Sequence, residues 1–167
     1  RLLLPPSSAS FSDARDFTPL ISGFGQVSDW AKSLRAFTLM REQAVRPNVV
    51  SFSALIDACA KGKQATLAMQ ILEEMRECAV VPNAISYTAA ISACSSTGTM
   101  WPQALELWQE MRRAAVMPTV LTISSTLRAY EFSRCWEQAL ELFSEMGSLK
   151  LAATTITYNY LIGAFKS

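Results

Sequence analysis

The amino-acid sequence repeats with a period of about 35 residues along most of its length. The period is clearest in four methionines, Met40, Met75, Met111 and Met146. The same step separates three prolines, Pro47, Pro82 and Pro118. A fixed period of this length is typical of repeat proteins, in which each unit is one supersecondary element that stacks on its neighbours. The chain is therefore expected to be a tandem array of such units.

Aligned on this period, the chain divides into four full units and part of a fifth. The expected units cover residues 14–48, 49–83, 84–119, 120–154 and 155–167. The third unit is one residue longer than the other full units, and the extra residue is expected in the segment 95–99, a loop that tolerates insertion. Residues 1–13 contain the run Pro5-Pro6-Ser7-Ser8 and are expected to be a linker or the remnant of an organelle transit peptide.

The apolar pattern within one unit predicts two helices. In the second unit, one helix face is formed by Phe52, Leu55, Ile56 and Cys59. Residues 61–63 interrupt this pattern, a second apolar face follows over 67–75, and Pro82 ends the unit because proline cannot continue a helix. A hairpin of this size buries its apolar faces only against neighbouring hairpins. The expected fold class is therefore all-α, an α-solenoid of tandem helix-turn-helix units.

Composition and charge exclude several classes of function. The 167 residues contain no histidine, which removes His-based catalytic triads and Cys/His zinc sites, and the four cysteines form no Cys-x-x-Cys pair. No apolar run reaches the ~20 residues that span a bilayer, and the net charge of +1 is too small for binding nucleic acid by bulk charge. We therefore expect no catalysis and no metal ion, cofactor, small-molecule substrate or membrane association. We also expect the protein to lie in a reducing compartment.

Four stretches of the sequence resemble the pentatricopeptide repeat family. They are Val49-Val-Ser-Phe-Ser-Ala-Leu-Ile-Asp-Ala-Cys-Ala-Lys with Ala68-Met-Gln-Ile-Leu-Glu-Glu-Met, Ala139-Leu-Glu-Leu-Phe-Ser-Glu-Met, and Thr155-Ile-Thr-Tyr-Asn-Tyr-Leu-Ile. The resemblance covers about residues 14–167. The related tetratricopeptide repeat has a period of about 34 residues and a different signature, whereas this chain closes its units with Pro-Asn or Pro-Thr.

The resemblance implies sequence-specific binding of single-stranded RNA at one base per unit. In this family a base is read mainly by the fifth and last residues of a unit, while an aliphatic second residue packs against the base plane. The fifth residues are Thr18, Ser53, Thr88, Ser124 and Asn159, and the last residues are Asn48, Asn83, Thr119 and Thr154. The aliphatic second residues are Val50, Ile85, Leu121 and Ile156, whereas Arg15 departs from this pattern.

The residues themselves leave other interpretations open. Short polar side chains in a first helical turn can also satisfy free backbone N–H groups, and aliphatic residues at a helix start can belong to the core. Lys61 matches a family position that contacts the RNA backbone, although a solvated surface charge is the usual role of a single lysine. The whole array has an alternative role as a protein-interaction solenoid, which binds a partner helix or peptide on its concave surface without binding RNA.

By the family's recognition rules, the first two units favour adenine and Asn159 favours a pyrimidine. The adenine-favouring pairs are Thr18 with Asn48 and Ser53 with Asn83. Thr119 and Thr154 differ from the usual Asp, Asn or Ser, so the third and fourth bases are undetermined. The expected footprint is A-A-N-N-pyrimidine, and the resemblance implies a role in RNA processing, stability or translation in the chloroplast or mitochondrion.

A small residue lies seven positions before each periodic methionine, where it would let helices approach closely: Ser33, Ala68, Ala104 and Ala139. The substitution Ala104→Phe should overpack this contact and lower the free energy of unfolding by about 1–3 kcal/mol. Thermal unfolding followed by circular dichroism measures the effect. An unchanged melting temperature would show that this position does not lie at a helix–helix contact.

Overall fold

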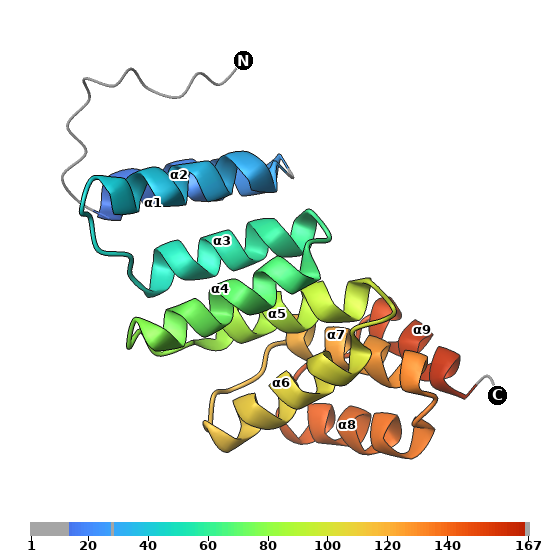
Figure 1. Ribbon diagram of the computed structural model, residues 1–167. Helices are drawn as coiled ribbons and strands as arrows, with labels where there is room; N and C mark the ends of the chain where they lie inside the picture. Colours follow the sequence, from blue (N-terminus) through green and yellow to red (C-terminus); the bar gives the residue numbers. More distant parts are fainter. Residues whose placement is uncertain (1–13, 28, 166–167) are drawn as a thin grey trace.

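The protein is a stack of helices in two layers, and Figure 1 shows the units following one another from the N-terminal to the C-terminal end. The structure is a computed structural model that describes residues 14–27 and 29–165, without the side chains of residues 15 and 16. The segment 1–13, expected to be a linker or transit-peptide remnant, lies outside the described residues, and so does the side chain of Arg15.

Helices are the only regular elements of the described residues, and they alternate between the two layers. One layer contains α1 (Ala14–Gln26), α3 (Val49–Lys61), α5 (Ala84–Ser96), α7 (Val120–Ser133) and α9 (Thr155–Ala164). The other contains α2 (Trp30–Glu42), α4 (Ala65–Glu77), α6 (Trp101–Arg113) and α8 (Trp136–Ser148). Each odd-numbered helix begins at the first residue of an expected unit, and the predicted all-α solenoid is confirmed. The loop 97–100 between α5 and α6 is one residue longer than the loop 62–64 between α3 and α4.

Direct packing of the odd-numbered helices holds the array together. Each packs on the next, from α1 on α3 to α7 on α9, and each even-numbered helix packs on the odd-numbered helices before and after it. The four periodic methionines are buried, and so are the four small residues that precede them by seven positions. The hydroxyl of Ser33, one of these small residues, donates a hydrogen bond to the Ile21 carbonyl at 3.0 Å. The sequence period is therefore the spacing of equivalent core positions.

The same turn ends every even-numbered helix. Its central residue has a left-handed backbone with φ between 53° and 57°, and the four residues are Ala44, Ala79, Ala115 and Lys150. The next N–H group along the chain donates to the carbonyl of the periodic methionine at 3.0–3.1 Å, which satisfies a carbonyl that the helix leaves free. Because this turn is repeated, each unit leaves its second helix in the same direction.

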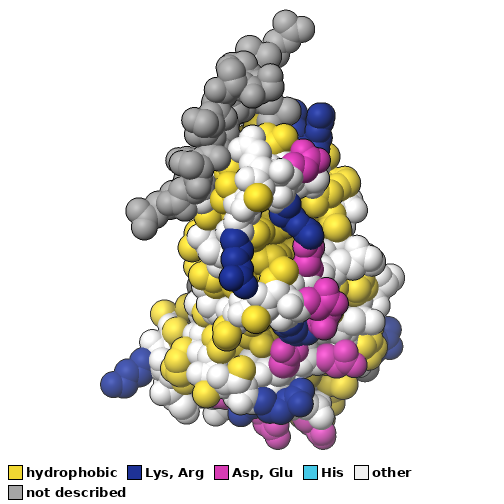
Figure 2. Space-filling view, turned by 60° about the vertical axis from the view of Figure 1, so that its left-hand side comes forward, with side chains coloured by type: hydrophobic (Ala, Val, Ile, Leu, Met, Phe, Trp, Pro, Cys, Tyr) yellow, Lys and Arg dark blue, Asp and Glu magenta, His cyan; other side chains and the backbone are white. Residues whose placement is uncertain are grey.

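Ion pairs join successive even-numbered helices. The pairs are Arg41–Glu74, Arg76–Glu110 and Arg112–Glu145, the last two with N–O distances of 2.7 and 3.5 Å. Each of these carboxylates thus faces an arginine of the preceding unit, and Figure 2 shows acidic and basic side chains interspersed on one face of the molecule. Because the odd-numbered helices pack directly while the even-numbered ones are linked through long side chains, the odd-numbered layer forms the inner side of the stack.

Two buried thiols predict a loss of stability at alkaline pH. Burial raises the pKa of Cys59 to about 12 and that of Cys94 to about 11, from an ordinary value of 9.0. Above pH 9 the thiols of the unfolded chain ionise first, so the free energy of unfolding should fall as the pH rises toward the folded-state values, by about 1–2 kcal/mol per thiol.

Urea unfolding between pH 8 and 11 measures this loss. The double variant Cys59→Ala/Cys94→Ala should show a shallower pH dependence than the wild type, whatever its absolute stability. The control is Thr66→Ala, because this exposed residue of α4 does not ionise and its substitution should leave the slope unchanged. Equal slopes in the wild type and the double variant would contradict the prediction.

Candidate functional site

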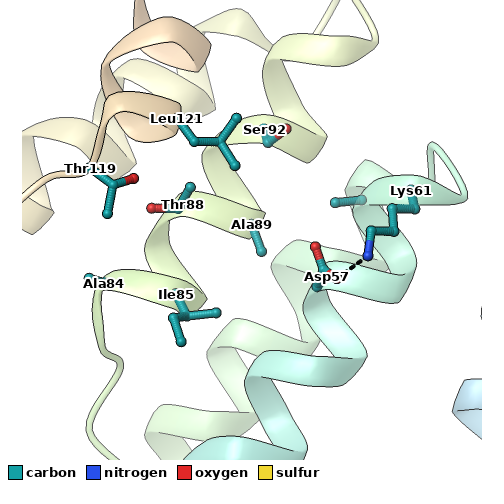
Figure 3. Close-up of a pocket in the computed structure, with 10 residues that line it drawn as sticks. Asp57, Lys61, Ala84, Ile85, Thr88, Ala89, Ser92, Thr119 and Leu121 are labelled. Atoms are coloured by element: carbon teal, nitrogen blue, oxygen red, sulfur yellow. Dashed lines mark ion pairs between the residues drawn. The ribbon is translucent and has the colours of Figure 1, made fainter. Parts of the chain in front are cut away.

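A groove on the inner layer runs across α3, α5 and α7 and has a volume of about 380 Å³. Figure 3 shows its central residues, Ile85, Thr88, Thr119 and Leu121. Thr88 and Thr119 lie beside one another, and Ile85 and Leu121 stand on either side of this polar pair. The groove therefore combines two aliphatic walls with hydroxyl groups between them. These residues belong to two consecutive units, so the groove is a product of their stacking.

The aliphatic second residues lie on the surface of the inner layer. Val50, Ile85, Leu121 and Ile156 are 54–63% exposed, although large aliphatic side chains are more often buried. The interpretation that they are core residues at the helix start is therefore wrong. Their period places one exposed aliphatic side chain at the start of each odd-numbered helix from α3 onward, so a regular stripe of apolar walls follows the array.

The fifth residues lie deeper than the aliphatic stripe. Ser53, Thr88 and Ser124 are only 3–7% exposed, whereas Thr18 is half-buried and Asn159 is exposed. Of these five, only Thr88 lines the groove. The column of polar groups is thus nearly covered at its centre and opens at its C-terminal end.

The hydroxyls of the fifth residues bind carbonyl and hydroxyl oxygens. Those of Thr18, Ser53 and Ser124 donate to the carbonyl four residues earlier at 2.7–2.8 Å. The hydroxyl of Thr88 is instead 2.6 Å from that of Thr122 in the next unit. None of these bonds satisfies a free backbone N–H group, so the local interpretation of the hydroxyls as helix-start acceptors is wrong.

The last residue of each full unit initiates the first helix of the next unit. The side-chain oxygens of Asn48 and Asn83 accept the N–H groups of the second and third helical residues at 2.9–3.0 Å. Thr119 and Thr154 accept the third N–H group at 3.2 and 3.3 Å. The third residue of each helix completes a reciprocal capping box, and these residues are Ser51, Ser86, Thr122 and Thr157.

This capping role was not predicted from the sequence, although the sequence contains a signal for it. An Asn or Thr is followed three positions later by Ser or Thr at each unit boundary, with the period of the whole array. Such a pair immediately before an apolar helical pattern is a helix-start signature. The last residues of the units therefore have a structural role of their own, whether or not they contact a ligand.

Hydrogen bonds connect the fifth and last residues of the same unit. In the second unit, the hydroxyl of Ser53 is 2.9 Å from that of Ser86, which donates to the side-chain oxygen of Asn83 at 3.0 Å. In the third unit, Thr122 connects Thr88 to Thr119 in the same way, at 2.6 and 2.9 Å. The two residues expected to address one base are thus held together by the capping residue of the following helix.

The polar groups left free differ between the units. The oxygen of Asn83 is used by its cap, while its amide NH₂ group makes no hydrogen bond to the described residues and remains a pair of donors. The single hydroxyl of Thr119 is used both by the backbone of Thr122 and by its side chain. The boundary after the second unit therefore offers donors that the boundary after the third unit lacks.

Lys61 is part of an ion pair at the edge of the groove. Its ammonium group is 2.7 Å from the carboxylate of Asp57, one helical turn earlier, and Figure 3 marks this contact. Both side chains line the groove and remain partly exposed. The positive charge expected to contact an RNA backbone is therefore balanced by a carboxylate at this position.

The arrangement defines a class of protein, the α-solenoid built from two-helix units, here with a groove on its inner layer. No helix in the described part of the chain is both long and apolar enough to cross a bilayer. Within this class, the chain belongs to the pentatricopeptide repeat family, because residues 11–164 match the family described as the pentacotripeptide-repeat region of PRORP. The resemblance inferred from the sequence is confirmed.

Known proteins similar to this chain are repeat proteins of the same kind. A pentatricopeptide repeat-containing protein of Arabidopsis thaliana is 32% identical over 61 residues, which is 36% of this chain and 11% of that protein. The pentatricopeptide repeat protein PPR10, solved in complex with an 18-nt psaJ RNA element, is 25% identical, with a TM-score of 0.77 over 96% of this chain and 23% of its own. This chain therefore spans only a small part of either relative.

A third similarity concerns the fold alone. The PPR domain of Arabidopsis thaliana protein-only RNase P 1, solved in complex with tRNA, has a TM-score of 0.80 at 15% identity. The match covers 95% of this chain and 83% of that domain. The stacking of two-helix units is thus shared across sequences that have little else in common.

The capping role of Asn83 predicts a stability difference between two variants. Asn83→Ala removes the acceptor for two N–H groups of α5 and should lower the free energy of unfolding by about 0.5–2 kcal/mol. Asn83→Asp keeps an acceptor and adds a negative charge at a helix N-terminus, so its stability should stay close to that of the wild type. Urea unfolding compares the three proteins, and equal stability of the Ala and Asp variants would contradict the capping role.

Proposed function

We propose that this chain binds single-stranded RNA, with successive bases inserted between the exposed aliphatic residues of successive units. The observation that carries this proposal is the stripe of more-than-half-exposed aliphatic side chains, which in the groove of the third unit stands on either side of the hydroxyls of Thr88 and Thr119. Similarity to PPR10, whose solved complex contains an RNA element, supports the choice of ligand. Unpaired bases offer both apolar faces and polar edges, which are the two kinds of surface that this groove complements.

In the groove of the third unit, a base would lie between Ile85 and Leu121 and present its edge to Thr88 and Thr119. The aliphatic walls would exclude water from the faces of the base, and the hydroxyls would meet its donors and acceptors. We call the space between two successive aliphatic residues a base slot. By the same stacking, Val50 and Ile85 would flank the base slot of the second unit, and Leu121 and Ile156 would flank that of the fourth. The slot of the fifth unit would use the exposed Asn159.

The free donors at the second unit support adenine at that position. The amide NH₂ of Asn83 can donate to N1 of adenine, while the oxygen of Ser53 can accept from its N6 amino group. Guanine has the donor N1–H where adenine has the acceptor N1, and the acceptor O6 where adenine has its amino group, so its edge has the opposite polarity at both positions. Thr18 and Asn48 form the corresponding pair of the first unit, and the proposed footprint is A-A-N-N-pyrimidine.

The proposed role is binding without catalysis, within the processing, stabilisation or translation of transcripts in a chloroplast or mitochondrion. Similarity to a protein of a plant, Arabidopsis thaliana, supports this setting. The alternative is a protein-interaction solenoid. The balanced charge of Lys61 and the nearly covered hydroxyls at the centre of the polar column are compatible with that alternative, and the following experiment separates the two.

A selection from random single-stranded RNA with the purified chain tests the proposal. The expected result is an enriched motif with two adjacent adenines. The variant Asn83→Asp preserves the helix cap but replaces the amide donor with an acceptor-only carboxylate, so the second adenine should change to guanine while the first stays. A base-reading contact of about 1–3 kcal/mol corresponds to a roughly fivefold to 150-fold change in preference.

The outcomes of this selection are distinct. Retention of no RNA by the wild type would overturn the proposal and favour the protein-interaction solenoid. An enriched motif that is the same for the wild type and for Asn83→Asp would leave RNA binding in place and overturn the assignment of Asn83 to the second base. Selection of the same motif by the Thr66→Ala variant, altered at an exposed position of the outer helix α4, provides the control.

A further inference from the structure

A cluster of one arginine and two aromatic rings lies where α7 meets α9. The guanidinium carbon of Arg128 is 5.9 Å from the ring centroid of Phe132 and 5.9 Å from that of Tyr160. One nitrogen of the same group donates to the carbonyl of Ser96 at 3.5 Å. The backbone of Gly98, in the loop between α5 and α6, lies against the ring of Phe132. Contacts from three segments therefore fix the position of this arginine.

The period of the array places this cluster on the inner layer. Arg128 is the ninth residue of its unit, and the ninth residues of the two preceding units, Asp57 and Ser92, both line the groove. Phe132 is the thirteenth residue and corresponds to Lys61, which lines the groove as well. Where the second unit has an Asp–Lys ion pair, the fourth unit therefore has an arginine and a phenylalanine one helical turn apart.

The charge of Arg128 is not balanced as that of Lys61 is. No carboxylate of the described residues forms an ion pair with Arg128, and the neighbouring Glu131 lies against Gly163 of α9. The guanidinium uses one hydrogen bond to a carbonyl and keeps its other N–H donors. The ring of Phe132 is 41% exposed. The inner layer thus carries a positioned cation without an ion-pair partner beside a partly exposed aromatic ring at this point.

We propose that Arg128 and Phe132 form a nucleotide-binding site in addition to the base slots, in which Arg128 binds a phosphodiester of the RNA and the ring of Phe132 stacks on a base. A planar guanidinium matches the oxygens of a phosphate, and its fixation by Ser96 and Tyr160 lowers the entropy lost on binding. Exposed aromatic rings bind unpaired bases through their faces irrespective of sequence. This site rests on the proposed RNA binding and supplies a backbone contact through a cation that, unlike Lys61, has no carboxylate partner among the described residues.

The salt dependence of binding tests the arginine. Fluorescence anisotropy with a labelled single-stranded RNA of mixed sequence, measured over a series of KCl concentrations, gives the slope of log K against log salt. Arg128→Gln should reduce the magnitude of this slope by about 0.7, the value for one phosphate contact of a single strand. Arg128→Lys keeps the charge and should retain most of the slope. The matched control is Arg113→Gln, which removes an exposed arginine of the outer helix α6 and should leave the slope unchanged.

The substitution Phe132→Leu tests the aromatic ring. Its result can be interpreted even if a variant of Arg128 does not fold. This substitution keeps an apolar side chain against Gly98 and should weaken binding about fivefold or more, with little change in the salt slope. Circular dichroism establishes that each variant folds. If the wild type binds the RNA but Arg128→Gln and Arg113→Gln have the same salt slope, this site is overturned and the proposed function stands. An unchanged affinity of Phe132→Leu has the same consequence. Failure of the wild type to bind the RNA would overturn the proposed function itself.

Discussion

Burial of each unit's apolar faces against the next unit is the interaction on which the rest of this structure depends. A pair of helices such as α3 and α4 leaves apolar surface exposed until α5 packs on both. The periodic methionines and the small residues before them are all buried by this packing. Since the contacts are repeated, the direction and spacing of every unit are fixed by its neighbour.

The stacking of the units determines the geometry of the candidate site. Ile85 and Leu121 belong to different units, so the distance between the two walls of the groove equals the step between units. The hydrogen bond between Thr88 and Thr122 spans the same boundary. A change in the packing of the core would therefore alter the width of the groove as well as the stability of the array, and the core residue Ala89 itself lines the groove.

Much of the fold could be predicted from the sequence because its signals are local and repeated. The spacing of apolar residues defines helix faces within one unit, and the period identifies equivalent positions among units. The period also identified Val50 and Ile85 as equivalent residues. Their exposure depends on which side of the stack they face, and the sequence of a single unit does not determine that side. The ion pair of Lys61 with Asp57 was accessible from their spacing of four residues. The cluster around Arg128 joins three segments and could not be found without coordinates.

The caps at the unit boundaries limit how such a protein can change its ligand in evolution. Residues such as Asn83 and Thr119 must accept N–H groups to begin a helix, and only a few short polar side chains do this well. Mutations that would introduce a long or apolar side chain there disrupt the helix start before they can alter recognition. Folding therefore restricts the side chains that these positions can hold, and any new ligand preference must come from Asn, Asp, Ser or Thr.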